Sequence, residues 1–599
     1  MVEAAMRRWS SLWRTPKSID NKRTMKMKAA CLRRSLLASC LALPLLASAE
    51  GQMPPSNPYL AQSYNNQTHW NDGASDSTDI AVARGSFKVT PDSYRVVPNE
   101  SASLIQYYDS VNGADVYWFW AGFSLRKLKI DDDLHISEIA RVDLPVTLPN
   151  YQPVTPQQRL EQAEQTRKYL EARDEEGLLK YMQGQPNRML SATTDQVLGG
   201  AIYSLLTRDN AFIGASGRRV FRIDQNDPKD ANSGMTLSRE AQLPEALFND
   251  AKVKAALGMP TDVTFGMGMT SNGFLVINTL GGTVATLDRN SLALIDSYRL
   301  ESADELFLNS FATGPELDGG AVYVASNQNM YRLAVDAQGK IHADEGSGAW
   351  KAAYDRGVRF DSVKIADGTG ATPTLMGFGA DDDKLVVITD GARKMRMVAF
   401  WRDGIPAGWK QKPGTLSARI ADQKEVDIGP GIDTVQSEQS VAVYGKYAFV
   451  VNNIPAQAKP TPVKSNYYVT LLNGVTRPMP QGVAMLKWDS DKDAWSQQWA
   501  RSDVSSISVV PMISGGSRMA IINGFYAQHP GEGYHIGMDL DTGKTKLEIA
   551  SGSNPLFNGM YAPVKVDRQG RLMYGMAFGL VLMDTSRMEK VKPTDLSQR

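Results

Sequence analysis

Cysteine and histidine are nearly absent from this chain. Among 599 residues it has two cysteines, Cys31 and Cys40, and five histidines. Both cysteines lie in a stretch that we expect to be removed on export. The mature protein would then carry no disulfide, thiol nucleophile, zinc–thiolate site or CxxCH haem attachment. So few histidines also disfavour a histidine-rich metal centre.

An excess of charge of either sign is also missing. The chain has 65 basic and 65 acidic residues, which gives a formal net charge of zero. Such a balance provides no net field to draw the protein onto nucleic acid or an anionic membrane, so we expect no nucleic-acid partner. Hydrophobic residues make up 42% of the chain, enough for a full core. The 50 glycines and 30 prolines favour a turn-rich β protein.

The N-terminal region contains one short apolar run that is typical of an export signal. Arg33 and Arg34 precede the run, and Ala47-Ser48-Ala49 follows it as a small-x-small cleavage site. The arginine pair fits either the general or the twin-arginine route. The run is too short to span a bilayer permanently, so we expect no integral membrane segment after signal cleavage. We predict a periplasmic or secreted product.

Paired apolar runs recur eight times along the rest of the chain. In one pair, Phe274–Asn278 is followed by Val284–Asp288. Runs rich in Val, Ile, Tyr and Phe suit strands that are buried on both faces. A single blade cannot bury both faces, so such blades stack around an axis. We predict an all-β fold, a β-propeller with eight blades or, with one atypical repeat, seven. The pairs begin near Asp115, Ala211, Phe274, Ala321, Lys384, Tyr447, Met519 and Arg571.

The domain organisation follows from these patterns. We predict a signal peptide at residues 1–49, with a true start at Met25 or Met27, and a flexible, polar lead-in at residues 50–85. The propeller would occupy residues 86–599. It would carry a small helical insertion near residues 155–183, which starts with the capping box Thr155-Pro156-Gln157-Gln158. This insertion would be a lid or brace on the propeller, or a solvated spacer between blades.

Several predicted strands end in a carboxamide or carboxylate side chain. If these strands line the channel, the side chains converge at one mouth. Oxygen atoms from several blades could bind Ca²⁺ there, or orient a polar small-molecule ligand. Alternatively, these residues only begin the turn after each strand. The candidate ligand-binding residues are Asn278, Asn327, Asn452 and Asn523, and the candidate metal ligands are Asp390, Asn452 and Glu438.

Glu438 and Asp390 are the candidate catalytic residues. Glu438 stands just before a buried strand and could act as a general base, or it could be a surface carboxylate that pairs with a lysine. His529 and His535 flank a loop and are further candidates for ligand binding. Their spacing matches no standard metal motif, and both could be ordinary loop residues.

Four motifs resemble a group of exported bacterial propellers of largely uncharacterised function. They are Gly370–Gly377, Ile388–Asp390, Ser437–Ser440 and Val451–Asn453, within roughly residues 320–500. More loosely, the whole chain is similar to quinoprotein-like and YVTN-type propellers. The likeness to eight-bladed quinoprotein alcohol dehydrogenases implies pyrroloquinoline quinone. The mature chain lacks their adjacent cysteines and repeated tryptophan motif, so we do not expect this cofactor.

The sequence therefore favours a periplasmic propeller that binds a small organic or polar ligand at its channel mouth, as an accessory to a catabolic pathway. Three alternatives stay open. The first is a calcium-dependent lactonase or esterase-type hydrolase, in which the metal polarises a carbonyl and Glu438 or Asp390 activates water. The second is a quinoprotein-type dehydrogenase. The third is a scaffold that docks another envelope protein on the propeller rim.

Overall fold

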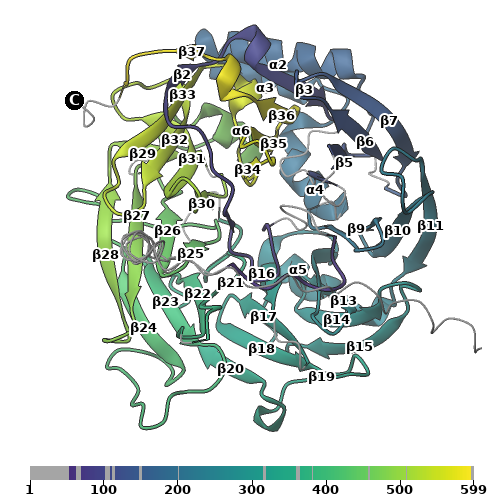
Figure 1. Ribbon diagram of the computed structural model, residues 1–599, viewed down its shortest axis with the longest axis vertical. Helices are drawn as coiled ribbons and strands as arrows, with labels where there is room; N and C mark the ends of the chain where they lie inside the picture. The colour runs from purple at the N-terminus through teal and green to yellow at the C-terminus, as the bar shows by residue number, and fades with distance from the viewer. Residues whose placement is uncertain are drawn as a thin grey trace, which may run out of the picture. The chain divides into compact units, whose positions relative to one another are not determined.

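The apolar runs of the sequence pair into antiparallel sheets. The computed structural model describes residues 53–61, 69–100, 108–110, 115–146, 151–199, 202–314, 319–358, 364–380, 382–455, 459–507 and 509–594. The signal peptide predicted at residues 1–49 lies outside the described residues. Within the unit Gly51–Arg599, eight sheets follow one another around a central axis (Figure 1).

The first four sheets come from the N-terminal half of the propeller. The first contains β4 (Tyr108–Ser110), β5 (Val116–Trp120), β6 (Ser124–Ile130) and β7 (Ile136–Asp143). The second contains β8 (Leu205–Leu206), β9 (Ala211–Ser216), β10 (Arg219–Gln225) and β11 (Met235–Gln242). The third contains β12 (Thr264–Met269), β13 (Phe274–Thr279), β14 (Thr283–Asp288) and β15 (Leu294–Arg299). The fourth contains β16 (Phe307–Thr313), β17 (Gly320–Ser326), β18 (Asn329–Val335), β19 (Ile341–His342) and β20 (Trp350–Ala353).

The other four sheets follow in chain order. The fifth contains β21 (Thr374–Met376), β22 (Leu385–Thr389), β23 (Arg396–Trp401) and β24 (Ile420–Glu425). The sixth contains β25 (Ala442–Tyr444), β26 (Tyr447–Val451), β27 (Val483–Asp489) and β28 (Ala494–Arg501). The seventh is built on β30 (Met512–Ser514), β31 (Met519–Tyr526), β32 (Gly533–Asp539) and β33 (Thr545–Gly552), with β29 (Val504–Ser506) paired to β31. The eighth contains β34 (Lys565–Val566), β35 (Leu572–Met576), β36 (Gly579–Met583) and β3 (Tyr94–Pro98).

Burial changes in a regular way from the inside of each sheet to its outside. In Figure 1 the first strand of a sheet lies near the axis and the fourth at the rim, as β16 to β19 illustrate. Strands in the middle of a sheet, such as β22, are buried at every residue because neighbouring sheets cover both faces. The outer strand β11 instead alternates between covered and exposed side chains. These four-stranded sheets confirm the predicted propeller fold, while the number of blades stays a prediction.

The N-terminal part of the chain closes the last sheet. β3 pairs antiparallel with β36, so residues from both ends of the propeller share the eighth sheet. A second N-terminal strand, β2 (Gly85–Lys88), joins the seventh sheet between β33 and β37 (Glu589–Lys590). The ring is thus held shut by main-chain hydrogen bonds between distant parts of the sequence.

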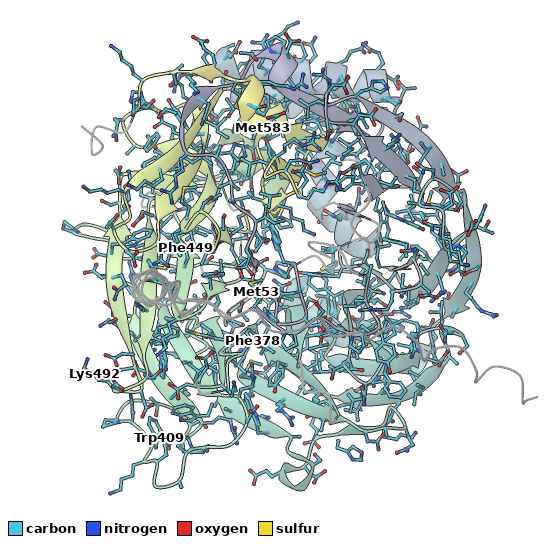
Figure 2. The ribbon with its side chains drawn as sticks, viewed as in Figure 1. Met53, Phe378, Trp409, Phe449, Lys492 and Met583 are labelled. Carbon is cyan, nitrogen blue, oxygen red and sulfur yellow. The ribbon has the colours of Figure 1, made fainter. Side chains whose placement is uncertain are left out.

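The segment before residue 86, which we predicted to be a flexible lead-in, contacts the inner strands. Main-chain hydrogen bonds join it to successive first strands: the amide of Thr313 donates to Asp72 at 2.8 Å, that of Leu375 to Gly73 at 2.8 Å, and that of Ile513 to Asp76 at 2.9 Å. Its strand β1 (Ser77–Thr78) lies parallel to β30. Figure 2 labels Met53, which lines a hollow of about 270 Å³ together with Phe378. These residues therefore run along the inner wall of the ring.

The predicted helical insertion is present as two helices. α2 (Pro156–Glu171) begins at the predicted capping box, where Thr155 and Gln158 exchange side-chain hydrogen bonds with each other's main-chain amides. α3 (Glu175–Gln183) follows after a short turn. Among the described residues, the other α-helices are α4 (Ala192–Gly199), α5 (Asp250–Leu257) and α6 (Asn466–Leu472). The short 3-10 helices are η1 (Pro91–Ser93), η2 (Met189–Ser191), η3 (Glu245–Leu247), η4 (Glu345–Ser347), η5 (Pro555–Phe557) and η6 (Thr585–Arg587).

A fully buried arginine fastens this insertion to the eighth sheet. Arg159 of α2 donates hydrogen bonds to the Asn99 side chain at 2.8 Å, to Gln162 at 2.7 Å, and to the carbonyl of Ala577. Its guanidinium also lies 4.6 Å from the centre of the Phe578 ring. The helical insertion is therefore a brace on the propeller. In the described part of the chain, none of the helices is both long and apolar enough to cross a membrane.

Candidate functional site

Polar side chains from several sheets meet along the inner wall of the ring. We call this group the central polar cluster. It consists of six polar side chains and the main chain of Gly370. They come from the N-terminal segment, from β16, and from the segments that lead into β8, β21 and β25: His69, Asp76, Tyr203, Asn309, Lys364, Gly370 and Glu438. Because first strands surround the axis, residues far apart in the sequence come together here.

An acid, an imidazole and a phenol form one side of the cluster. His69 Nδ1 lies 2.9 Å from Asp76 Oδ2, and His69 Nε2 lies 3.4 Å from the Tyr203 hydroxyl. Burial raises the pKa of the Asp76 carboxyl above its ordinary range, although His69 opposes this shift. Burial also raises the pKa of the Tyr203 phenol, which keeps it protonated.

The main chain around this pair is strained. Trp70, Ala74 and Asp76 all have left-handed backbone angles, with φ of 74°, 50° and 48°. Such angles are uncommon for residues other than glycine and require support from the surrounding structure. The hydrogen bonds to the inner strands supply that support, and they hold His69 and Asp76 against the ring.

Asn309 connects the first side of the cluster to the second. Its Oδ1 accepts hydrogen bonds from the Tyr203 hydroxyl, from Thr372 Oγ1 at 3.2 Å and from the Ser310 amide at 2.8 Å. Its Nδ2 donates to the Gly370 carbonyl at 2.8 Å. Asn309 is only half-buried, so the cluster can be reached from solvent.

Glu438 and Lys364 form the second side, next to Gly370. A β-carbon added to Gly370 would lie 3.2 Å from Glu438 Cγ and 3.8 Å from Lys364 Cε, so both side chains pack close to the main chain of Gly370. The Ile365 amide donates to Glu438 Oε1, and Lys364 Nζ donates to the Gly368 carbonyl at 2.7 Å. Burial lowers the pKa of the Lys364 ammonium group, and the charge of Glu438 opposes the shift.

Several buried polar atoms on the segments that carry these residues lack a hydrogen-bond partner among the described residues. Three of them belong to the segment that carries Glu438 or to its neighbour: Gln436 Oε1, Ser440 Oγ and Asn453 Nδ2. Ser204 Oγ and Thr369 Oγ1, which adjoin Tyr203 and Gly370, also lack one. Buried polar groups are rarely left unsatisfied, so their concentration here points to a polar occupant.

The carboxamides that the sequence singled out lie one strand further from the axis. Asn278 on β13 accepts from the Gly266 amide at 2.7 Å and donates to the Asn309 carbonyl at 2.9 Å. Asn327 accepts from the Leu306 amide at 2.9 Å and donates to the Asp304 carbonyl at 3.1 Å. Both amides tie their strand to a neighbouring segment of main chain.

Asn452 and Asn523 make the same kind of tie. Asn452 accepts from the Gln436 amide at 3.0 Å, and Asn523 accepts from the Gly559 amide at 2.8 Å. Their Nδ2 atoms donate to main-chain carbonyls at 2.9 and 3.0 Å. The partners belong to the next strand, sheet or loop, so these bonds hold the ring together. Asn452 also bonds to the main chain of Ile454, two residues later, which is the turn-initiating type of bond that we weighed as the alternative.

Asp390 directly follows β22 and is held by hydrogen bonds within its own sheet. Its two oxygens accept from the main-chain amide of Arg396 at 2.8 Å and from the guanidinium of Arg396 at 2.7 Å. Burial raises the pKa of Asp390 to about 6 in spite of that arginine. Asp390, Asn452 and Glu438 thus each accept hydrogen bonds from the protein. Among the described residues, no three His, Cys, Asp or Glu side chains form a group suited to a metal.

The two predicted histidines differ in environment. His529 is half-exposed in the loop between β31 and β32. His535 lies on β32 and is fully buried, and within the described structure neither ring nitrogen has a hydrogen-bond partner. Burial lowers the pKa of His535 to about 3. Its ring packs 4.8 Å from that of Tyr574.

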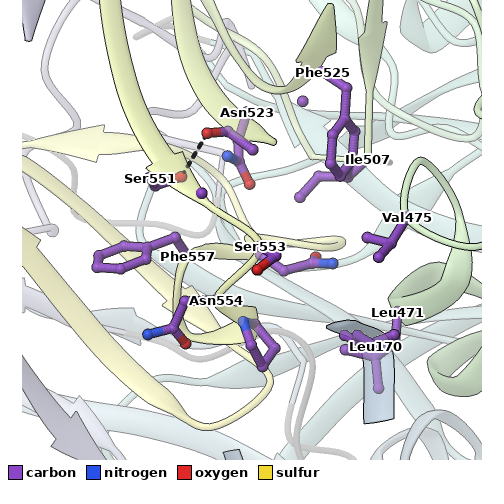
Figure 3. Close-up of a pocket in the computed structure, with 15 residues that line it drawn as sticks. Leu170, Leu471, Val475, Ile507, Asn523, Phe525, Ser551, Ser553, Asn554 and Phe557 are labelled. Atoms are coloured by element: carbon purple, nitrogen blue, oxygen red, sulfur yellow. Dashed lines mark hydrogen bonds between the residues drawn. The ribbon is translucent and has the colours of Figure 1, made fainter. Parts of the chain in front are cut away.

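A separate pocket lies between the helices and the seventh sheet. Figure 3 shows Leu170 of α2, Leu471 of α6 and Phe525 of β31 around a hollow of about 350 Å³, part of which is open to solvent. Asn523 forms part of its wall, although its amide is bonded to main chain. The pocket is lined mostly by apolar side chains and carries no charged group, so it offers less chemistry than the central polar cluster.

Sequence reasoning found Glu438 and missed the rest of the cluster. His69 and Asp76 belong to the polar stretch that we interpreted as a lead-in, and Tyr203 and Asn309 stand in no motif. One signal was available: His69 is one of only five histidines and is followed directly by Trp70, an unusual pair for a solvated linker.

Comparison with known proteins gives a fold and no activity. No protein-family model matches the chain. A protein of Archaeoglobus fulgidus, itself uncharacterized, is 29% identical over 326 residues, or 53% of this chain and 59% of that protein. The chain thus spans less than two thirds of that relative.

Solved structures that the chain matches include quinohemoprotein alcohol dehydrogenases. ADHIIG from Pseudomonas putida HK5 has 13% identity and a TM-score of 0.44, over 89% of this chain and 82% of that one. The Comamonas testosteroni enzyme has 10% identity and a TM-score of 0.44, over 87% and 80%. The Cps50 propeller domain of Myceliophteria thermophila has 9% identity and a TM-score of 0.32, over 64% and 94%.

Proposed function

We propose that this protein is an exported propeller that binds a small polar organic molecule at the central polar cluster. The observation that carries the proposal is a set of buried polar atoms next to Gly370 and Glu438 in the sequence that have no partner among the described residues, such as Thr369 Oγ1 and Ser440 Oγ. Leaving such a group unsatisfied costs about 1–3 kcal/mol. A ligand that bonds to several of them would recover much of that free energy.

The composition of the cluster suits a ligand with both donor and acceptor groups. Lys364 and the Asn309 amide supply donors, and Glu438 supplies an acceptor, all next to Gly370. A few convergent polar groups on a rigid wall are typical of small-molecule sites. We keep export as part of the proposal because of the apolar run before Ala49.

A thermal-shift screen of the purified mature protein tests this proposal. A compound present at 100 times its Kd stabilises the folded state by about 2.7 kcal/mol. For a unit of about 550 residues, with an unfolding entropy of ~2.1 cal/mol/K per residue, that equals a rise in Tm of about 2 °C. The panel contains hydroxy acids, polyols, sugars, amino acids and amines.

A matched pair of variants locates the binding site. Glu438→Gln should weaken binding at least tenfold, while Glu425→Gln, on the exposed face of the outer strand β24, should leave it unchanged. The proposal fails if no compound in the panel raises Tm. It also fails if the two variants bind the hit equally well.

A hydrolase of lactones or esters is the second candidate. The observation that favours it is the buried Glu438 carboxylate, which the Ile365 amide orients beside Lys364. Such a carboxylate could take a proton from water during attack on a carbonyl. Hydrolysis of p-nitrophenyl acetate or a simple lactone should then be abolished in Glu438→Gln. Metal analysis after dialysis would test whether calcium takes part, as we expected from Asp390 and Asn452.

A further inference from the structure

The Asn309 side chain has one N–H group that none of the described residues accepts. Its oxygen already accepts three hydrogen bonds, from Tyr203, Thr372 and the Ser310 amide. Of its two N–H groups, one donates to the Gly370 carbonyl, and none of the described residues accepts the other. Because Asn309 is half-exposed, that second N–H group is available to an acceptor atom of a ligand.

The neighbours of Asn309 fix which way round its amide is held. Tyr203 gives its only proton to Asn309, so it can bond to His69 Nε2, 3.4 Å away, only as an acceptor, and His69 carries a proton on Nε2. Asp76 bonds to the other ring nitrogen, Nδ1, at 2.9 Å. The Tyr203 hydroxyl has a single proton, which it donates to Asn309 Oδ1. Hydrogen bonds joined in series polarise one another, so this chain makes the Asn309 N–H groups better donors.

We propose that the central polar cluster binds a small hydroxycarboxylic acid, with Asn309 as the specificity-determining residue. This inference rests on the proposed ligand-binding function. The carboxylate of the ligand would accept from the second N–H group of Asn309 and lie near the Lys364 ammonium group. The ligand's hydroxyl would donate to Glu438, which lies beside Gly370. Asp76, His69 and Tyr203 are positioning residues that hold the amide.

Three probes of nearly equal size separate the contributions of the two ligand groups. Glycolate carries a carboxylate and a hydroxyl, acetate lacks the hydroxyl, and ethylene glycol lacks the carboxylate. Isothermal titration of the mature protein should give the tightest binding for glycolate, with acetate and ethylene glycol each at least tenfold weaker. Equal affinity for all three compounds overturns the inference.

An isosteric change at Asn309 tests the role of its amide. Asn309→Asp replaces the N–H donor with an oxygen and adds a negative charge, so glycolate should bind at least tenfold more weakly. The control Asn290→Asp adds the same charge in an exposed turn and should bind glycolate as the wild type does. Circular dichroism and the Tm establish that both variants are folded.

A separate measurement tests the positioning role of Asp76, His69 and Tyr203. In protein labelled with ¹⁵N-histidine, whose five side chains are few enough to assign by single substitutions, His69 should carry a proton on Nε2. Asp76→Asn should change that signal and weaken glycolate binding, and Tyr203→Phe should also weaken binding. If both variants bind glycolate as the wild type does, the positioning role is wrong.

The titrations distinguish failure of this inference from failure of the proposed function. If polyols or amines bind in a manner that Glu438→Gln weakens, and hydroxycarboxylates do not, the site binds another class of ligand and only the present inference is wrong. If no small polar compound binds, both are wrong.

Discussion

His535 makes a measurable contribution to the pH dependence of stability. It is fully buried on β32, opposite Asn523 in the register with β31. Burial lowers its pKa to about 3, from an ordinary value of 6.5. Below pH 6.5 the unfolded chain therefore binds a proton that the folded protein excludes. His535 stabilises the folded state fully above pH 6.5, and this contribution is lost as the pH falls toward 3.

The size of the effect follows from the shift. Each pH unit below 6.5 costs about 1.36 kcal/mol, so acidification to pH 5 should cost about 2 kcal/mol. For a unit of about 550 residues this equals roughly 2 °C in Tm. His535→Leu removes the titrating group, together with two ring nitrogens that have no partner among the described residues. Its Tm should therefore gain about 2 °C relative to the wild type between pH 7.5 and pH 5.

Calorimetry of the two proteins at both pH values measures the gain. The comparison has to be between variant and wild type, because Asp390 acts in the opposite direction. Its pKa is raised to about 6, so its contribution to stability falls as the pH rises from 3.8 to 6. His529→Gln, in the half-exposed loop, is the control and should show no gain. A constant Tm difference between His535→Leu and the wild type at both pH values would refute the reasoning.

Three further substitutions probe the inner wall and the brace. Gly370→Ala puts a side chain at a φ of +65°, 3.2 Å from Glu438 Cγ, so it should lower the free energy of unfolding by about 1–2 kcal/mol and weaken ligand binding at the cluster. An unchanged Tm and affinity would contradict the proposed site. Arg159→Met leaves several buried acceptors without a donor, so a loss of about 2–4 kcal/mol and faster proteolysis at α2 are expected, and a wild-type digestion pattern would argue against the brace. Asn278→Asp removes the donor to the Asn309 carbonyl and should lower stability by about 1–3 kcal/mol, whereas a neutral effect in calorimetry would mean that the tie is dispensable.

The inner repeats of the fold were predictable because they carry a strong physical signal. The predicted run Phe274–Asn278 is β13 within one residue, and Val284–Asp288 is β14 within one residue. Both strands are covered on two faces, so their sequences are almost continuously apolar. The flanking strands give weaker signals. β8 has only two residues, Leu205–Leu206, and the outer β11 alternates in exposure, so neither stands out from a loop.

The candidate site was less predictable because the closure of the ring assembles it. Asn278 and Asn452 were singled out because they end apolar runs, yet such runs are second strands and their amides are used to tie the ring together. His69 and Asp76 lie in a polar segment whose order depends on main-chain bonds to strands hundreds of residues away. No periodicity in the segment itself indicates those bonds. Glu438 was found because a carboxylate just before a buried strand is unusual.

The pairing of β3 with β36 has a consequence for biosynthesis. Tyr94 emerges from the ribosome hundreds of residues before its partner Met583. Until then the nascent protein presents unpaired backbone that other chains could capture. Contacts this distant in sequence also form slowly. A protein truncated before residue 579 should therefore aggregate in the cell, and holding the polypeptide unfolded until translation is complete should improve the yield of native protein.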